Sequence, residues 1–98
     1  LLGDEVYEHI LFDGRVHQSL LRDDVLYARS FVVSSFGKTY HITGWKIGYC
    51  VAPPALSVEF RKVHQYLTFC SFHAAQWALA DYMAADTGFH LQLSAFYQ

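Results

Sequence analysis

The feature that most constrains the fold is a pair of short apolar runs on either side of a polar segment that holds two lysines. The first run is Phe31 to Val33, and the second is Ile47 to Ala52, which stops at Pro53-Pro54. Short runs rich in β-branched and aromatic residues, bounded by turn residues, predict strands. Residues 34–46 between them would make a poor core, so we interpret this segment as a candidate site.

The polar segment has the residue types for carbonyl chemistry on a lysine. Lys38 follows the first run directly after Gly37, where the backbone can approach a ligand closely. A lysine amine is a nucleophile that can form a Schiff base with an aldehyde. Ser34, Ser35 and Lys46 add hydroxyl groups and a positive charge suited to a phosphate. This combination suggests pyridoxal 5'-phosphate, although the spacing alone favours solvated loop lysines and turn-forming serines.

Two motifs in order resemble those of a known family. Residues 34–40 (SSFGKTY) and 43–49 (TGWKIGY) resemble the cofactor-lysine segment of fold-type I aminotransferases of class I/II. Residues 4–7 (DEVY) are similar to the strand-end motif that precedes it, here 34 residues before Lys38. Residues 34–53, together with 64–69, are most similar to the methionine aminotransferase branch, which neighbours the kynurenine aminotransferases.

The resemblance implies an α/β fold. Residues 1–98 would be a fragment of the large pyridoxal-phosphate-binding domain, with strands followed by C-terminal helices, and without the N-terminal part or the C-terminal small domain. The resemblance implies that Lys38 forms the Schiff base with the cofactor. It also implies that Asp4 pairs with the protonated ring nitrogen and that Tyr7 donates to the phenolic oxygen of the ring. Ser35 and Lys46 are expected to be the further cofactor-binding residues.

The implied reaction transfers an amino group from a methionine-like or aromatic amino acid to a 2-oxo acid, in a parent protein that is a homodimer. Two alternatives are a non-catalytic structural or interaction fragment and a pyridoxal-phosphate-dependent carbon–sulfur lyase of the same fold. Lys46 stands where the family usually has arginine, and it keeps the charge but lacks the bidentate fork. The family's phosphate loop, an asparagine beside the ring and the carboxylate-binding arginine have no match here. We therefore expect the 98 residues alone to be inactive.

Composition excludes several other classes of function. A net charge of −2, with acidic and basic residues mixed, provides no basic stripe for nucleic acid. No apolar run approaches the roughly 20 residues that span a bilayer. The histidines and cysteines form no metal-binding motif, and the isolated Cys50 and Cys70 are typical of buried thiols in a reducing compartment, which predicts a cytoplasmic location.

The apolar content predicts that the chain packs against further residues. Hydrophobic residues make up 53% of the 98 residues and aromatic residues 17%, and this apolar content is high for one small domain. The chain starts with Leu1 rather than methionine, and Leu1-Leu2 resembles the end of a strand. We therefore expect it to be an excerpt of a longer protein.

The remaining elements follow from periodicity and turn residues. We expect a helix that begins at Ser57 and runs to about Cys70, a second helix at 74–86 with apolar residues on all sides, a stop at Gly88, and the start of another helix from 89. Residues 9–30 are expected to form a loop, with a turn at Asp13-Gly14 and a helical turn over 19–26. His9 and His17 are expected to be solvated, and Trp45 to fill the core.

Overall fold

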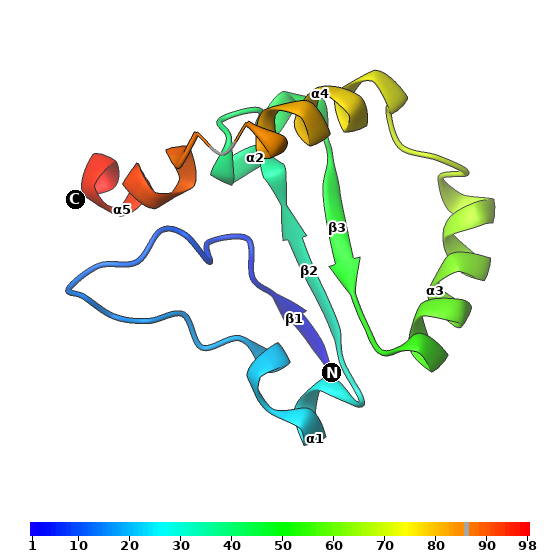
Figure 1. The fold of residues 1–98 in the computed structure, drawn as a ribbon. Helices are drawn as coiled ribbons and strands as arrows, with labels where there is room; N and C mark the ends of the chain where they lie inside the picture. Colours follow the sequence, from blue (N-terminus) through cyan, green and yellow to red (C-terminus); the bar gives the residue numbers. More distant parts are fainter. Residues whose placement is uncertain (86) are drawn as a thin grey trace.

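The computed structural model describes residues 1–85 and 87–98, and its centre is a mixed three-stranded sheet (Figure 1). The strands lie in the order β1 (Leu2–Asp4), β2 (Phe31–Ser35) and β3 (Gly48–Val51). β1 pairs with β2 in parallel, and β2 pairs with β3 in antiparallel. Both strands expected between residues 31 and 52 are confirmed, as is the strand at the start of the chain.

The parallel pair brings the two sequence motifs to one edge of the sheet. Asp4 at the end of β1 is in register with Val33 of β2, and the amide of Glu5 continues the ladder by donating to the carbonyl of Val33 (2.8 Å). Parallel strands end at the same edge, where ligands of α/β folds bind. The helix α2 (Phe36–Thr39) follows β2 directly at that edge (Figure 1).

The longer helices follow the sheet in the chain. They are α3 (Pro54–Leu67), α4 (His73–Ala84) and α5 (Leu93–Tyr97). α3 begins one turn earlier than expected, because proline fits the first helical position, where its missing N–H is not needed. Ser57 lies inside the helix: its amide donates to the carbonyl of Pro53 and its hydroxyl to the carbonyl of Ala52, both at 2.9 Å.

The other expected boundaries are the end of the second helix, the stop at Gly88 and the start of the third helix. The expected end of the second helix at Asp86 lies outside them. Gly88 adopts a left-handed conformation, with φ of 63°, and separates α4 from the next helical segments. These are a 3₁₀ helix at Phe89–Gln92 and α5, so the third helix is confirmed.

The loop between β1 and β2 follows the predicted pattern. Asp13 and Gly14 have φ of 57° and 65°, and the amide of Arg15 donates to the carbonyl of Phe12 (3.1 Å), which closes the expected turn. The expected helical turn is present as a 3₁₀ helix at Leu20–Arg22 and α1 at Asp24–Tyr27.

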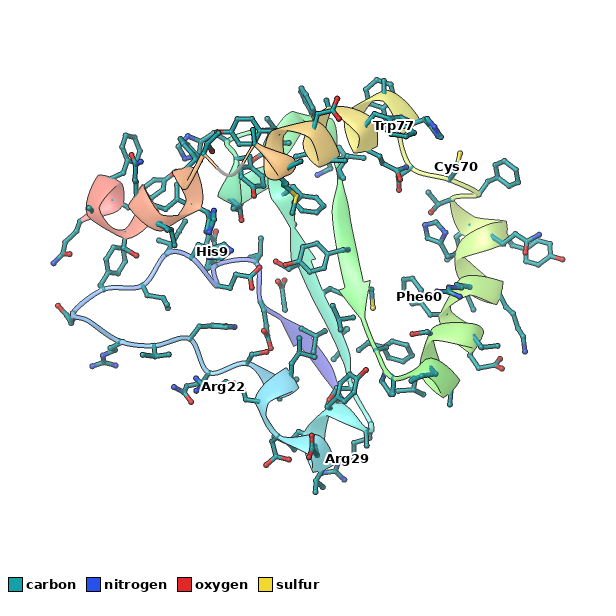
Figure 2. All side chains as sticks on the ribbon, viewed as in Figure 1. His9, Arg22, Arg29, Phe60, Cys70 and Trp77 are labelled. Atoms are coloured by element: carbon teal, nitrogen blue, oxygen red, sulfur yellow. The ribbon has the colours of Figure 1, made fainter. Side chains whose placement is uncertain are left out.

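A small core joins α4 to the sheet edge. Ile47, Ala75 and Leu79 are buried together, and three half-buried residues pack against them: Phe36, Tyr40 and Ile42. α3 meets the sheet through Phe60, whose ring centroid lies 5.9 Å from that of Phe31 (Figure 2). The core therefore lies beside α2, the helix that carries Lys38.

Much apolar surface remains exposed along α3 and α4. Tyr66 is 87% exposed, and several neighbouring side chains are largely exposed as well: Leu67, Phe69, Phe72 and Trp77 (Figure 2 labels Trp77). α4 was expected to be covered on all sides, but Ala75 and Leu79 are its buried residues. Further chain or a partner would have to cover the rest, so this covering stays a prediction.

Two expected absences can be examined in the described part of the chain. Within residues 1–85 and 87–98, no helix is both long enough and apolar enough to cross a membrane. The same residues contain no group of three or more metal-ligating side chains in a suitable arrangement. Cys50 is half-buried and Cys70 is exposed, so the expectation of burial is wrong for Cys70.

Candidate functional site

Lys38 is placed by the junction of β2 and α2. Ser35 has extended backbone angles, and its Oγ accepts a hydrogen bond from the amide of Gly37 (3.0 Å), which caps the helix. The same hydroxyl donates to the carbonyl of Ile47 (3.3 Å) and so ties the helix start to the segment that enters β3. Lys38 is the third residue of this capped helix.

Lys38 and Tyr7 line the same cavity. It has a volume of about 390 Å³, and its other lining residues are Ile10, Phe12 and Tyr97. The walls are therefore mainly apolar and aromatic, and Lys38 supplies the one charged group among the five lining residues. The structure thus brings together an amine and a phenol that are 31 positions apart in the sequence.

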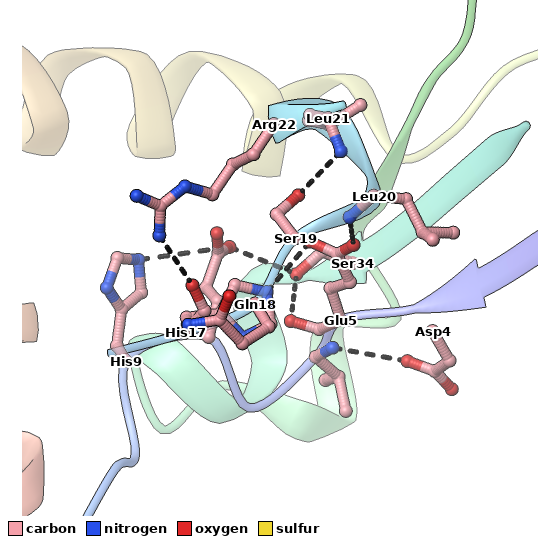
Figure 3. Close-up of polar contacts among 12 residues, drawn as sticks. Asp4, Glu5, His9, His17, Gln18, Ser19, Leu20, Leu21, Arg22 and Ser34 are labelled. Atoms are coloured by element: carbon pink, nitrogen blue, oxygen red, sulfur yellow. Dashed lines mark hydrogen bonds and ion pairs between the residues drawn. The ribbon is translucent and has the colours of Figure 1, made fainter. Parts of the chain in front are cut away.

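Asp4 lies at the same sheet edge, at the end of β1. Its side chain is exposed, and its Oδ1 accepts a hydrogen bond from the amide of Val6 (3.2 Å), which shapes the turn that leads to Tyr7 (Figure 3). A carboxylate, a phenol and an amine thus belong to two adjacent strand ends. This donor set fits the ring nitrogen, phenolic oxygen and aldehyde of pyridoxal phosphate.

Lys46 has a different setting. It is exposed, has φ of 56° and ends the 3₁₀ helix Thr43–Trp45, with its amide donating to the carbonyl of Thr43 (3.3 Å). It is not among the residues that line the cavity of Tyr7 and Lys38. Trp45 beside it is 45% exposed, so the prediction that Trp45 fills the core is wrong.

A part-buried contact between Glu5 and His17, beside Asp4, differs from the sequence-based expectation. Glu5 is 9% exposed, and its Oε2 lies 2.8 Å from Nε2 of His17, while its Oε1 accepts from the amide of Leu20 (2.9 Å) (Figure 3). Burial by itself raises the pKa of Glu5, but the hydrogen bonds from His17, Ser19 and the Leu20 amide outweigh it and lower the pKa. The expectation that His17 is solvated is therefore wrong.

A second polar group joins the Tyr7 turn to the sheet. Oε1 of Glu8 accepts hydrogen bonds from the hydroxyl of Tyr49 (2.6 Å) and from the hydroxyl of Ser34 (3.2 Å). The sequence suggests that Ser34 could donate to a phosphate, yet in the structure Ser34 is 8% exposed and its hydroxyl donates to the Glu8 carboxylate. No local spacing links these residues, so sequence reasoning could have found only that Glu8 follows the DEVY motif.

With this arrangement established, comparison with known proteins decides the family. The sequence profile described as "Aminotransferase class I and II" matches residues 1–95. The chain belongs to the class I and II aminotransferase family. The resemblance of the two motifs to this family is thereby confirmed, and so is the α/β fold.

Individual aminotransferases agree with this assignment. The chain is 55% identical over 98 residues to methionine aminotransferase of Escherichia coli, covering all of this chain and 25% of that one. It is 31% identical over 96 residues to human kynurenine–oxoglutarate transaminase 1, covering 98% of this chain and 23% of the relative. The chain thus spans about a quarter of the length of these relatives.

Solved aminotransferase structures have the same fold over this region. The Escherichia coli protein YbdL, for which a methionine aminotransferase function was identified, superposes with a TM-score of 0.92 at 56% identity, over 98% of this chain and 25% of that chain. N-succinyldiaminopimelate aminotransferase of Mycobacterium tuberculosis gives a TM-score of 0.87 at 33% identity, over 96% and 24%. The similarity to the methionine and kynurenine branch of the family is confirmed.

Proposed function

We propose that the full-length protein containing this chain is a pyridoxal-phosphate-dependent aminotransferase. It transfers an amino group from a methionine-like or aromatic amino acid to a 2-oxo acid. The observation that carries the proposal is the cavity shared by Tyr7 and Lys38, beside the strand end of Asp4. The 55% identity to a methionine aminotransferase supports the substrate class.

Each residue of the site has a role that its chemistry supports. When bound, pyridoxal phosphate supplies an aldehyde that bonds to amines and a ring that takes up electrons from the substrate α-carbon. The amine of Lys38 would hold the cofactor, and as a free amine it would move the proton of that carbon. The carboxylate of Asp4 would hold the proton on the ring nitrogen. The hydroxyl of Tyr7 donates to the phenolic oxygen.

We also propose that Lys46 and Ser35 bind the phosphate group of the cofactor. Lys46 supplies a positive charge, and Ser35 supplies a hydroxyl at the start of the helix that carries Lys38. Ser35 also caps this helix, so its replacement should affect both the local structure and cofactor binding.

Borohydride trapping tests the assignment of Lys38. The full-length protein is incubated with pyridoxal phosphate, reduced and mapped by peptide analysis. This chain has three lysines, so Lys46 and the exposed Lys62, which pairs with Glu59 at 2.7 Å, serve as internal controls. We expect the label on Lys38. Equal labelling of the three lysines would overturn the proposal.

Product analysis tests the reaction. We expect Lys38→Ala to lower the rate of transamination by about 10² to 10⁴-fold, the usual range for loss of a general acid–base group. Turnover of a sulfur amino acid should yield an oxo acid. Release of a thiol with ammonia would instead identify a carbon–sulfur lyase and contradict the proposed reaction.

We further infer that the full-length protein is a homodimer. The exposed aromatic surface around Tyr66, Phe69 and Phe72 supports additional packing of this region. Light scattering of the full-length protein would measure its mass, and a monomer would contradict the inference.

The cytoplasmic location remains a prediction, which fractionation of the source cells would test.

A further inference from the structure

The turn that carries Tyr7 consists of two successive backbone hydrogen bonds. The amide of Glu8 donates to the carbonyl of Glu5 (3.0 Å), and the amide of Ile10 donates to the carbonyl of Tyr7 (2.9 Å). The Tyr7 side chain is 55% exposed, so packing around it does little to fix its place. Its position therefore depends on how the turn is attached to the sheet.

The carboxylate of Glu8 attaches the turn to both neighbouring strands. Its two hydroxyl donors are Tyr49 of β3 at 2.6 Å and Ser34 of β2 at 3.2 Å, and these two residues are direct partners in the strand register. The sheet thus holds both donors side by side. Hydrogen bonds to an ionised acceptor are roughly twice as strong as neutral ones.

Ser34, which donates to Glu8 at one end of the Tyr7 turn, also lies near Glu5 at the other end. The hydroxyl of Ser34 also lies 3.4 Å from the carbonyl of Glu5, so it can reach either end (Figure 3 shows Ser34 beside Glu5). Ser34 is followed directly by Ser35, the cap of the helix that carries Lys38. The attachment point of the Tyr7 turn is thus one residue from the cap of the Lys38 helix.

We propose that Glu8 is a positioning residue, which keeps the Tyr7 turn in register with the strand end that carries Lys38. This inference rests on the proposed function. Glu8 does not line the cavity of Tyr7 and Lys38, so it acts through Tyr7 and not on the reacting atoms. The half-buried His9, with Nε2 3.8 Å from the same Glu8 oxygen, flanks the carboxylate as well.

Spectroscopy and trapping on the full-length protein loaded with pyridoxal phosphate test this role. The variants are Glu8→Ala, Tyr7→Phe, their combination, Tyr49→Phe and Glu8→Gln. The first readout is the pH at which the absorption of the bound cofactor changes. The second is the rate of borohydride labelling of Lys38. Glu59→Ala is the matched control, because Glu59 is an exposed carboxylate paired with Lys62.

We expect Glu8→Ala to shift the absorption transition in the same direction as Tyr7→Phe and to slow the labelling of Lys38 on the order of 10-fold, since misplacement by 1 Å can cost up to about 10²-fold. Tyr49→Phe should give a smaller shift of the same sign. Glu8→Gln keeps an acceptor oxygen in place and should remain within about threefold of the wild type. The combined variant should match Tyr7→Phe alone, because both changes act through one hydroxyl.

Additive shifts in the combined variant would overturn the positioning role. The positioning role would also be overturned if Glu8→Ala changed the two readouts no more than Glu59→Ala does. If Glu8→Ala fails to fold, the conservative Tyr49→Phe decides the question by the same two readouts. Equal labelling of all lysines in the wild type would overturn the proposed function and this inference with it. Selective labelling of Lys38 that the Glu8 and Tyr49 variants leave unchanged would overturn the positioning role alone.

Discussion

The carboxylate of Glu5 and the imidazole of His17 lie 2.8 Å apart although they are 12 positions apart in the chain. Glu5 directly follows β1 and Asp4, whereas His17 lies near the middle of the connection between β1 and β2; Figure 3 shows the two residues together. The pair closes this loop on the strand end. This part of the loop is therefore attached to the strand end that carries Asp4.

The Glu5–His17 pair should give the protein an acid-dependent stability. The pKa of Glu5 is lower in the folded state than its ordinary value of 4.5. The stabilisation is therefore complete above about pH 4.5 and is lost as the pH falls through the lower folded pKa. Glu5→Gln should lower the free energy of unfolding by about 1–2 kcal/mol at neutral pH and remove this part of the acid dependence. Thermal melting against pH measures both, and parallel curves for the two proteins would contradict the prediction.

Ser35 should stabilise the start of the Lys38 helix. Ser35→Ala removes both the cap on the Gly37 amide and the hydrogen bond to the Ile47 carbonyl. We expect a loss of about 1 kcal/mol, within the range of 0.5–2 kcal/mol for N-cap replacements. Ser35→Asp keeps the acceptor and should recover most of the loss. Chemical denaturation of the three proteins checks the order, and equal stability of Ser35→Ala and wild type would refute the capping role.

A side chain at Gly48 should destabilise the protein, because this glycine lies against the backbone of the neighbouring strand. A Cβ at this position would lie 2.6 Å from the carbonyl oxygen of Ser34, a backbone atom of β2. Gly48→Ala should therefore cost about 1–3 kcal/mol, as overpacking does, and disturb the Ser34 contact with Glu8. Gly44→Ala is the control, since its Cβ would meet nothing within 4 Å. Similar melting temperatures for the two variants would show that the strand can shift freely.

The hydroxyl of Tyr49 should titrate at unusually high pH. Burial raises its pKa above the ordinary 10.0, and the hydrogen bond to the Glu8 carboxylate raises the pKa further. Glu8→Gln removes the negative charge, so the pKa of Tyr49 should fall toward its ordinary value. Ultraviolet titration of phenolate formation measures this, with Tyr49→Phe to identify the signal. An unchanged titration in Glu8→Gln would mean that the Glu8–Tyr49 contact is absent in solution.

The helix boundaries show what periodicity and turn residues can predict. The turn at Asp13-Gly14 is confirmed because positive φ is a local property of these residues. Gly88 also has positive φ, but α4 already ends at Ala84, and Gly88 precedes the next 3₁₀ helix. The observed start of α3 differs from the predicted one, because Pro53-Pro54 not only follows the end of β3 but also, through Pro54, opens the helix. Here one residue type serves two roles, and the local sequence does not separate them.

The burial of individual side chains was predicted less well. Trp45 is half exposed and His17 is paired, contrary to expectation. Hydrophobicity indicates what a side chain favours, whereas its exposure depends on which segments the fold brings against it. Glu5 shows the same limit, since this buried carboxylate finds its half-buried partners 12 to 15 positions away in the loop.

The sequence by itself determined the family, the strands that flank Lys38, and the two motifs that carry the candidate site residues. These depend on residue type and spacing within short segments, which can be recognised without coordinates. Only the tertiary structure decided that Tyr7 and Lys38 line one cavity, and that Glu8 meets Ser34 and Tyr49, which lie 26 and 41 positions away. The physical reason is that strand register, a long-range property, sets these neighbours.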